Sequence, residues 1–252
     1  MRSNKVKDIW QDGGTAFCGW MASESPLLAE TIGVSGVDAV VVDLQHGASD
    51  MHNLMSMMQA ISATSAVPMV RLPGNVPETI MKALDFGAYG LICPLVNNAD
   101  EARALVDASR YPPQGGRSFA TARVFNYAGA DYFAHANDAI MRLAMVETRD
   151  GLDNIEEILA VDGLDGIFVG PTDLAIALGM TPGPEGAHAE LEEAIAHALA
   201  MTKKAGKHAG IFCSGGAGAK RRRDEGFDLV VPTAELYIFK KAMAQEVADY
   251  NS

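Results

Sequence analysis

Polar and charged side chains end or closely follow several short apolar runs of the sequence. Five of them could take part in chemistry, namely Asp43, His46, Arg71, Glu147 and Asp173. If the apolar runs are parallel strands of a barrel, their carboxyl ends meet on one rim and these side chains share one site. A rim that holds this many charged groups without a ligand or metal would be costly. The pattern therefore favours a binding or catalytic site.

Each of these residues also has a structural explanation when it is taken alone. An Asp after a strand commonly caps the following helix, and Asp173 could do only that. Arg71 could pair with a nearby carboxylate, and His46 could be a hydrogen-bonded turn residue. Glu147 is the hardest to explain in this way, because it directly follows four apolar residues. The functional interpretation rests on the five residues together.

Glu147 and Asp173 offer hard carboxylate oxygens, which suit Mg²⁺ or Mn²⁺. A cation held by this pair could chelate a 2-oxo acid through its ketone and carboxylate oxygens and stabilise the enolate as a Lewis acid. The sequence thus predicts a divalent metal site, with Mg²⁺ or Mn²⁺ expected first and Co²⁺ or Zn²⁺ left open.

Three further features fit the same chemistry. Arg71 supplies a fixed cation for an enolate oxygen, and His46 can move a proton near neutral pH. The segment of Gly170, Pro171, Thr172 and Asp173 opens a predicted helix, so its free N–H groups could bind a substrate carboxylate. We expect a carbon–carbon bond to be made or broken next to a pyruvate-like enolate.

The lysines argue against an imine mechanism. A Schiff-base aldolase needs a lysine inside the barrel, whereas every lysine falls in a predicted helix, a terminus or a turn that enters a strand. The lysines are Lys5, Lys7, Lys82, Lys203, Lys204, Lys207, Lys220, Lys240 and Lys241.

Eight strand–helix units must position these side chains, because short apolar runs alternate with longer stretches of helical spacing. The predicted strands are Thr15–Met21, Asp38–Asp43, Pro68–Arg71, Tyr89–Cys93, Leu143–Glu147, Gly166–Val169, His208–Phe212 and Asp228–Val231. The predicted helices are Pro26–Val34, Met51–Ser62, Pro77–Phe86, Ala99–Ser109, Leu152–Ala160, Ala187–Lys204, Ala217–Asp224 and Ala234–Val247. We expect one α/β domain over residues 1–252, a single (β/α)8 barrel.

One connection, at about residues 111–137, is too long for this rhythm and is rich in Pro, Gly and aromatic residues. Long connections are uncommon unless they are functional or ordered by neighbours. We expect a lid or a subunit contact above the barrel mouth, with a passive ordered insertion as the alternative.

Composition limits the partners. The formal net charge of −12 argues against nucleic acid, and the basic run 220–223 is interpreted as a solvated helix face. No apolar run approaches the ~20 residues of a membrane span, and Met1–Trp10 lacks a signal-peptide core. The three separated cysteines fit neither a disulfide framework nor a zinc site. We expect a soluble cytoplasmic protein.

The same motifs, in this order and spacing, resemble the class II pyruvate aldolases of the HpcH/HpaI family over about Gly19–Val231. The segments that carry the resemblance are Val42–Gly47, Val70–Pro73, Asn98–Arg103, Arg110–Ser118, Val146–Thr148 and Asp165–Leu174. The resemblance implies cleavage of a 4-hydroxy-2-oxo acid to pyruvate or hydroxypyruvate and an aldehyde. It implies a lyase that works through a metal-stabilised enolate.

The resemblance also assigns roles to residues. It implies that Glu147 and Asp173 hold the metal, that His46 is the acid–base group and that Arg71 stabilises the enolate. Asp85 matches an aspartate that orients the histidine across a subunit boundary, and Gly170 to Asp173 match a carboxylate cradle. The last helix of such barrels swaps between subunits, commonly in a homohexamer. Gln45 departs from the family, in which many relatives carry Glu, so metal affinity or aldehyde preference could differ.

Two other functions stay open at this point. A citrate-lyase-like enzyme would cleave acyl-CoA thioesters on a related barrel, but the sequence offers no obvious basic groove for the CoA phosphates. A non-catalytic 2-oxo-acid sensor would not need the proton shuttle that His46 offers.

Overall fold

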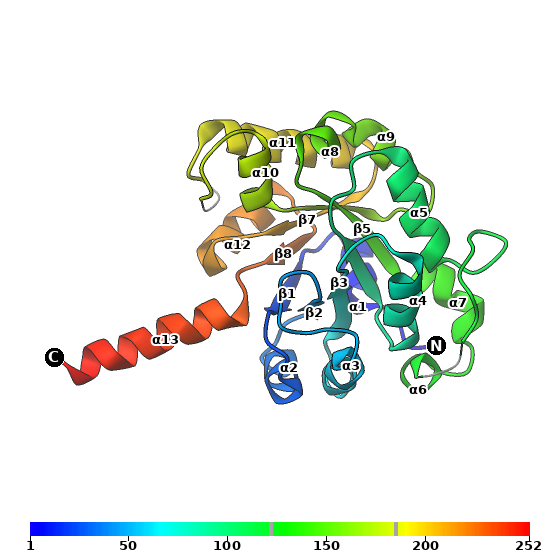
Figure 1. The fold of residues 1–252 in the computed structure, drawn as a ribbon, viewed down its shortest axis with the longest axis horizontal. Helices are drawn as coiled ribbons and strands as arrows, with labels where there is room; N and C mark the ends of the chain where they lie inside the picture. The colour runs from blue at the N-terminus through cyan, green and yellow to red at the C-terminus, as the bar shows by residue number, and fades with distance from the viewer. Residues whose placement is uncertain (121–122, 184–185) are drawn as a thin grey trace.

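The computed structural model describes residues 1–120, 123–183 and 186–252. Eight parallel strands pair in sequence order and the last pairs with the first, which closes a barrel (Figure 1). The strands are β1 (Ala16–Met21), β2 (Ala39–Asp43), β3 (Val67–Arg71), β4 (Gly90–Cys93), β5 (Met141–Val146), β6 (Gly166–Val169), β7 (His208–Phe212) and β8 (Leu229–Val231). The predicted (β/α)8 fold is confirmed.

Helices between successive strands surround the barrel, α1 precedes the first strand, and α13 follows the last strand and extends away from the barrel (Figure 1). They are α1 (Lys5–Gln11), α2 (Pro26–Gly33), α3 (Leu54–Ser62), α4 (Pro77–Asp85), α5 (Ala99–Ser109), α6 (Val124–Ala128), α7 (Tyr132–Ala139), α8 (Arg149–Asp153), α9 (Ile155–Leu159), α10 (Pro171–Ala177), α11 (Ala189–Lys204), α12 (Gly215–Glu225) and α13 (Glu235–Tyr250). The sequence interpretation missed α1, and it joined α8 and α9 into one helix.

The strands have nearly continuous apolar sequences because both of their faces are buried. All residues of β2 and β3 are buried, including the charged Asp43 and Arg71 at their ends. Register brings those two residues side by side, since Asp43 pairs with Arg71 across the two strands. The packing of the barrel thus fixes the position of charged groups at its carboxyl rim.

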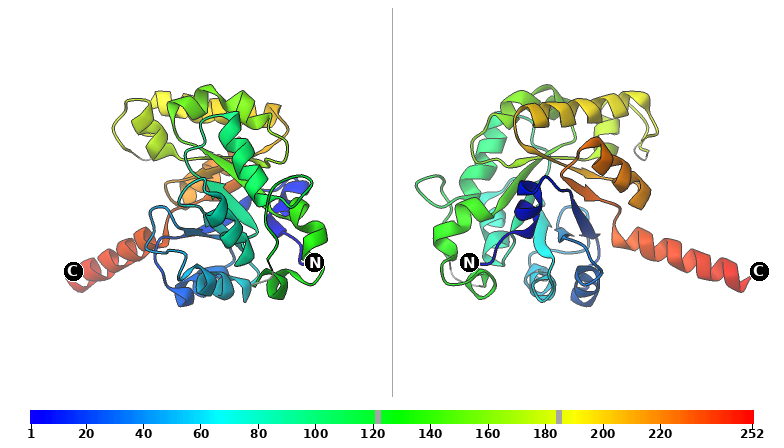
Figure 2. Two further views of the ribbon diagram at one scale, coloured as in Figure 1. Left: turned by 45° about the vertical axis from the view of Figure 1, so that its right-hand side comes forward. Right: turned by 180° about the vertical axis from the view of Figure 1, so that it is seen from behind.

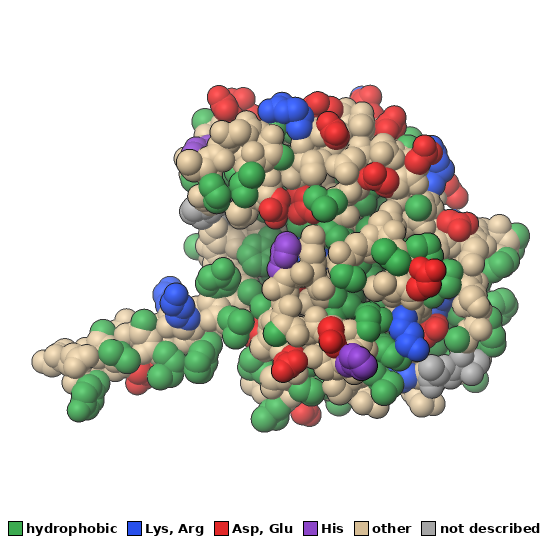
Figure 3. Space-filling model, in the orientation of Figure 1, with side chains coloured by type: hydrophobic (Ala, Val, Ile, Leu, Met, Phe, Trp, Pro, Cys, Tyr) green, Lys and Arg blue, Asp and Glu red, His purple; other side chains and the backbone are tan. Residues whose placement is uncertain are grey.

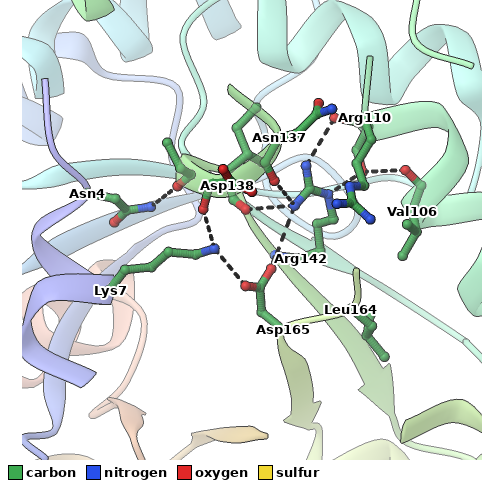
Figure 4. A network of polar contacts seen from close by, with 12 residues as sticks. Asn4, Lys7, Val106, Arg110, Asn137, Asp138, Arg142, Leu164 and Asp165 are labelled. Atoms are coloured by element: carbon green, nitrogen blue, oxygen red, sulfur yellow. Dashed lines mark hydrogen bonds and ion pairs between the residues drawn. The ribbon is translucent and has the colours of Figure 1, made fainter. Parts of the chain in front are cut away.

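A polar network closes the opposite, amino-terminal end of the barrel (Figure 4). Lys7 Nζ lies 2.7 Å from Asp165 Oδ1 and donates to the carbonyl of Asp138 at 2.6 Å. The buried guanidinium of Arg142 donates to the carbonyl of Asn137 at 3.1 Å. Burial lowers the pKa of Arg142 to about 10, and the charge of Asp165 opposes that shift. In this fold the amino-terminal end serves stability rather than catalysis.

The long insertion lies at this amino-terminal end, so the prediction of a lid above the mouth of the same barrel is wrong. Asp131 pairs with the N-terminal ammonium group at 2.7 Å, and the amide of Arg2 donates to the carbonyl of Ala128 at 2.8 Å. The reason is topological, because a connection from a helix to the next strand begins and ends where strands enter the barrel. Subunit contact by this insertion stays a prediction, and residues 121–122 lie outside the described part of the chain.

Helix α13 leaves the body of the barrel and extends away from it (Figures 1 and 2). Only its first residue is buried; Glu235 accepts hydrogen bonds from the amides of Ala22 at 2.7 Å and Ser23 at 2.6 Å. Hydrophobic side chains lie exposed at several places along this helix (Figure 3). They include Leu236, Tyr237, Ile238, Phe239, Met243, Val247 and Tyr250.

The basic run at 220–223 is not wholly a solvated face, which corrects the sequence interpretation. Arg222 is buried and forms a two-pronged pair with Glu192, at 2.7 and 2.9 Å, and a further pair with Glu225 at 2.8 Å. Lys220 and Arg223 are exposed, as expected. Within the described residues, no helix has the length and apolar character needed to cross a bilayer.

Candidate active site

A cleft of about 300 Å³ opens at the carboxyl rim of the barrel. It brings together most of the residues that the sequence singled out, from strands β2, β3 and β6 and the loops behind them. Its lining consists of Trp20, Ala22, Asp43, His46, Arg71, Met145, Phe168, Gly170, Pro171, Thr172, Asp173, Phe212, Ala234 and Tyr237. Both polar and apolar side chains line the cleft.

Arg71 is held by a two-pronged pair with Asp43. Its Nε donates to Asp43 Oδ1 at 2.8 Å, and its Nη2 donates to Asp43 Oδ2. Burial opposes ionisation of Asp43, but the hydrogen bonds and the charge of Arg71 hold the pKa of that carboxyl below its usual value. The guanidinium is thus a fixed cation facing the cleft, as an oxyanion-stabilising group requires. Arg71 does pair with a nearby carboxylate, as its structural explanation required. This pair nevertheless borders the cleft, so the two explanations are compatible.

His46 lies on a tight turn behind β2. Asp43 Oδ1 accepts the backbone N–H groups of Gln45 at 3.0 Å and His46 at 3.2 Å, which sets the path of the turn. Gly47 follows because a Cβ there would lie 2.3 Å from the carbonyl oxygen of Asp43. The His46 side chain is exposed and borders the cleft, where it could exchange a proton with a bound molecule. The side-chain oxygen of Gln45 is buried without a hydrogen-bond partner among the described residues.

Glu147 directly follows β5, which ends at Val146. It is buried, and its Oε1 accepts the N–H of Leu95 at 2.9 Å. Its Oε2 lies against the backbone of Gly170, where a Cβ would approach to 2.9 Å. Burial raises the pKa of Glu147, and the charge of Asp173 adds to that effect while the Leu95 hydrogen bond opposes it. A nearby cation would relieve this cost of ionising Glu147.

The loop after β4 orients Glu147, and sequence reasoning missed it. Asn97 holds this loop in place through its side chain. The side-chain nitrogen donates to the Leu95 carbonyl at 2.9 Å, and the side-chain oxygen accepts from the Thr148 hydroxyl. The amide of Asn97 donates to Glu101 Oε2 at 2.6 Å, and its carbonyl accepts from Asn154 Nδ2 at 2.9 Å. Leu95 has a left-handed backbone, with φ of 54°. The segment Asn98–Arg103 was noticed only as a family motif.

Asp173 lies in the first turn of α10, behind β6. The N-cap residue is Gly170, so a capping role does not account for Asp173. Strands β5 and β6 pair with Val146 opposite Val169, so Glu147 and Asp173 follow neighbouring strand ends. The influence of Asp173 on the pKa of Glu147 reflects this proximity.

Asp85 does not join this site within one chain. It ends α4, which returns from the carboxyl rim to the amino-terminal end of the barrel. There it accepts a hydrogen bond from Arg117 Nη2 at 3.0 Å, and Arg117 also donates to the Tyr132 hydroxyl at 2.8 Å. A role beside His46 would therefore require the Asp85 of another subunit.

The donor set fits a divalent cation that keeps open coordination positions. Across residues 1–120, 123–183 and 186–252, no cluster of three or more Asp, Glu, His and Cys side chains could hold a metal by itself. Glu147 and Asp173 would supply two hard oxygens, leaving positions for water or substrate. No lysine borders the cleft as described, which agrees with the sequence argument against imine chemistry.

Comparison with known proteins places this geometry in a family. The model of the HpcH/HpaI aldolase/citrate lyase family matches residues 17–234. The hydroxypyruvate/pyruvate aldolase of Rhizorhabdus wittichii is 44% identical over 98% of each chain. The 5-keto-4-deoxy-D-glucarate aldolase of Klebsiella pneumoniae subsp. pneumoniae is 38% identical over 91% of this chain and 90% of the relative.

A solved structure is similar over the whole fold. It is an HpcH/HpaI aldolase/citrate lyase family protein from Burkholderia cenocepacia J2315, with a TM-score of 0.92 and 31% identity. The match covers 99% of this chain and 100% of that one. With its closed barrel and its strand-end cleft, this chain belongs to the HpcH/HpaI aldolase/citrate lyase family.

Proposed function

We propose that this chain is a class II aldolase that reversibly cleaves a 4-hydroxy-2-oxo acid to pyruvate, or hydroxypyruvate, and an aldehyde. The observation that carries the proposal is the shared location of Arg71, His46 and Asp173 in one cleft, with the Glu147 carboxylate against Gly170 of its lining. The names of the two curated relatives described above, both aldolases, support the same reaction class.

Glu147 and Asp173 are the residues that would hold a divalent cation, with Mg²⁺ or Mn²⁺ favoured and Co²⁺ or Zn²⁺ as alternatives. When bound, such a cation supplies Lewis-acid polarisation of the ketone of the 2-oxo acid. In the segment Gly170–Asp173, the backbone N–H groups of Thr172 and Asp173 are proposed to bind the substrate carboxylate, because Pro171 has no N–H and Gly170 donates its own to the Val146 carbonyl.

His46 and Arg71 are proposed to divide the work of cleavage. His46 takes the proton of the 4-hydroxyl group, and the C3–C4 bond breaks to release the aldehyde. The bonding electrons move into an enolate, whose oxygen faces the fixed guanidinium of Arg71. Protonation of the enolate carbon then gives pyruvate.

Several properties of the assembly belong to the same proposal. The exposed apolar side chains of α13 support a homo-oligomer, in which this helix packs on a second subunit in a hexamer. In that assembly Asp85 of one subunit would orient His46 of another. The expected compartment is the cytoplasm, and the expected partners are a 2-oxo acid and an aldehyde.

A citrate-lyase-like acyl-CoA lyase activity is the second candidate. Arg71 is the one Lys or Arg side chain among the described residues that line the cleft, and it is already paired with Asp43. CoA phosphates would therefore find no free cation there. Cleavage of a malyl thioester without action on free 2-oxo acids would favour this candidate.

Separate variants of His46 and Arg71 test the division of roles. Arg71→Ala should reduce both aldol cleavage and exchange of the pyruvate methyl protons by about 10²–10³-fold, the effect of one lost oxyanion donor. His46→Ala should reduce cleavage by roughly 10²–10⁴-fold and leave pyruvate binding largely intact. Steady-state kinetics and deuterium exchange followed by NMR measure both. A wild-type exchange rate in Arg71→Ala would remove Arg71 from the mechanism, and intact cleavage in His46→Ala would remove His46.

A further inference from the structure

Trp20 lies near the end of β1, where its indole ring borders the cleft. The side chain is only 3% exposed. Its ring stacks on Phe168, with centroids 5.8 Å apart, and meets Phe212 edge-on at 5.3 Å. These aromatic contacts hold the indole in one orientation.

Two different parts of the indole contact the Asp43–Arg71 pair. The ring N–H donates to Asp43 Oδ2 at 3.3 Å. The ring face lies beside the guanidinium of Arg71, whose Cζ is 4.9 Å from the ring centroid, within the range of a cation–π interaction. Phe could provide the face but not the N–H group, so only tryptophan makes both contacts.

Asp43 links these contacts to the rest of the site. Its Oδ1 accepts from Arg71 Nε and from the amides of Gln45 and His46, while its Oδ2 accepts from Arg71 Nη2 and from Trp20. Rotation of this carboxylate would therefore move the guanidinium and the His46 turn together. The indole N–H is the side-chain contact, other than Arg71 itself, that resists such rotation.

We propose that Trp20 is a positioning residue that fixes Arg71 at the angle needed to receive charge on the substrate oxygen. The inference rests on the proposed aldolase function, which it deepens by assigning the support of the oxyanion-binding cation. It predicts a defect in the chemical step rather than in binding of the 2-oxo acid, because the guanidinium matters most when charge develops.

Trp20→Phe and Trp20→Leu test the proposal, with Trp10→Phe as the matched control. Trp10 is the only other tryptophan of the chain. It is also buried and donates its N–H to the Asp228 carbonyl at 2.7 Å, but it stacks on His208 at the start of β7, far from the cleft. Trp20→Phe should lower kcat by about 10–100-fold, the size of a lost hydrogen bond to a charged group, with little change in the KM for pyruvate. Trp20→Leu should lower kcat further, and Trp10→Phe should leave both parameters unchanged.

A spectroscopic comparison tests the contact without relying on catalysis. In Trp10→Phe protein, Trp20 is the single remaining tryptophan and reports on the cation beside its ring. Adding Arg71→Ala should change the emission intensity of Trp20, and adding Arg103→Ala, an exposed arginine on α5, should not. Equal emission in all three proteins would overturn the contact.

The kinetic outcomes separate this inference from the proposed function. Wild-type kcat and KM in Trp20→Phe, in a wild-type enzyme that is active, would overturn the positioning role alone. An equal loss of kcat in Trp10→Phe would also overturn it, since general loss of folded protein would then explain the effect. Absence of aldolase activity and of pyruvate proton exchange in the wild type would refute the proposed function, and with it the positioning role of Trp20.

Discussion

The charged residues in and beside the cleft differ in how well their buried charges are compensated. Arg71 and Asp43 are joined by two hydrogen bonds and carry opposite charges, so the attraction between them offsets much of the free energy that burying each charge costs. Glu147 has no cationic partner in direct contact among the described residues and accepts a single backbone hydrogen bond. Natural proteins commonly accept such local instability where activity requires it. Glu147 is therefore the residue at which stability and metal binding should oppose each other.

Glu147→Gln should stabilise the metal-free protein near neutral pH and weaken its affinity for Mn²⁺. The folded-state pKa of Glu147 is raised. A carboxyl group whose pKa is raised by folding stabilises the folded protein at pH values below its unfolded-state pKa. This stabilisation is lost as the pH rises through the folded-state pKa. In EDTA, the Tm of the wild type should therefore fall relative to the Tm of Glu147→Gln as the pH rises above the usual pKa range of a glutamate. Excess metal should partly restore activity to the variant. A Tm difference that does not vary with pH would contradict this account.

At the scale of elements, the loops that follow the strands orient the functional side chains. The strand β4 ends at Cys93, yet its following loop supplies the N–H group that orients Glu147. Sequence patterns did not reveal this, because Leu95 acts through its backbone and Asn97 through contacts with residues distant in sequence. The strands themselves were predictable, since burial on both faces leaves nearly continuous apolar runs.

Asn97→Ala should weaken metal binding without direct contact with the metal. The change removes the hydrogen bonds to the Leu95 carbonyl and from the Thr148 hydroxyl, so the loop no longer holds its N–H toward Glu147. We expect a roughly 10-fold rise in the Kd for Mn²⁺, at the lower end of the effect of losing an outer-shell partner. Titration calorimetry measures it. Asn53→Ala is the control, because this half-buried asparagine precedes α3 and hydrogen-bonds to Glu24 rather than to the loop after β4. Equal Kd values for wild type and Asn97→Ala would refute the role of this loop.

The insertion shows the limit of sequence reasoning about elements. Its length and composition led to the prediction of a lid or a subunit contact, with an ordered insertion as the alternative, and its described residues include α6 and α7. Its position was misjudged because length alone does not say at which end of a barrel a connection lies. The order of elements does, since α5 runs back to the entry of β5.

At the scale of the whole molecule, α13 is the feature that a single chain leaves unexplained. Its apolar side chains lie exposed along a helix that leaves the barrel (Figure 3). Contiguous exposed apolar surface usually marks an interaction site. Its first turn is fixed to the rim of the cleft through Glu235, and Tyr237 borders the cleft. Assembly and activity should therefore be linked.

Charge on the exposed face of α13 should break the assembly. Phe239→Asp with Met243→Asp should convert the oligomer into a smaller species, because the substitutions place charge in a buried apolar contact. Light scattering coupled to size exclusion measures the mass. Lys240→Asp with Lys241→Asp is the control on the same helix, with charge replaced at sites that are already polar. An unchanged mass in the first double variant would contradict the proposed subunit contact.

The most direct test of the account is metal-dependent exchange of the pyruvate methyl protons, because that exchange reports enolate formation without any aldehyde. Protein in ²H₂O with pyruvate and Mn²⁺ or Mg²⁺ should incorporate deuterium. EDTA should abolish the incorporation, and Glu147→Gln should require more metal to restore it. Borohydride with pyruvate should leave the protein unlabelled, since no lysine borders the cleft as described. Exchange that persists in EDTA, or a trapped covalent adduct, would contradict the metal-assisted enolate mechanism.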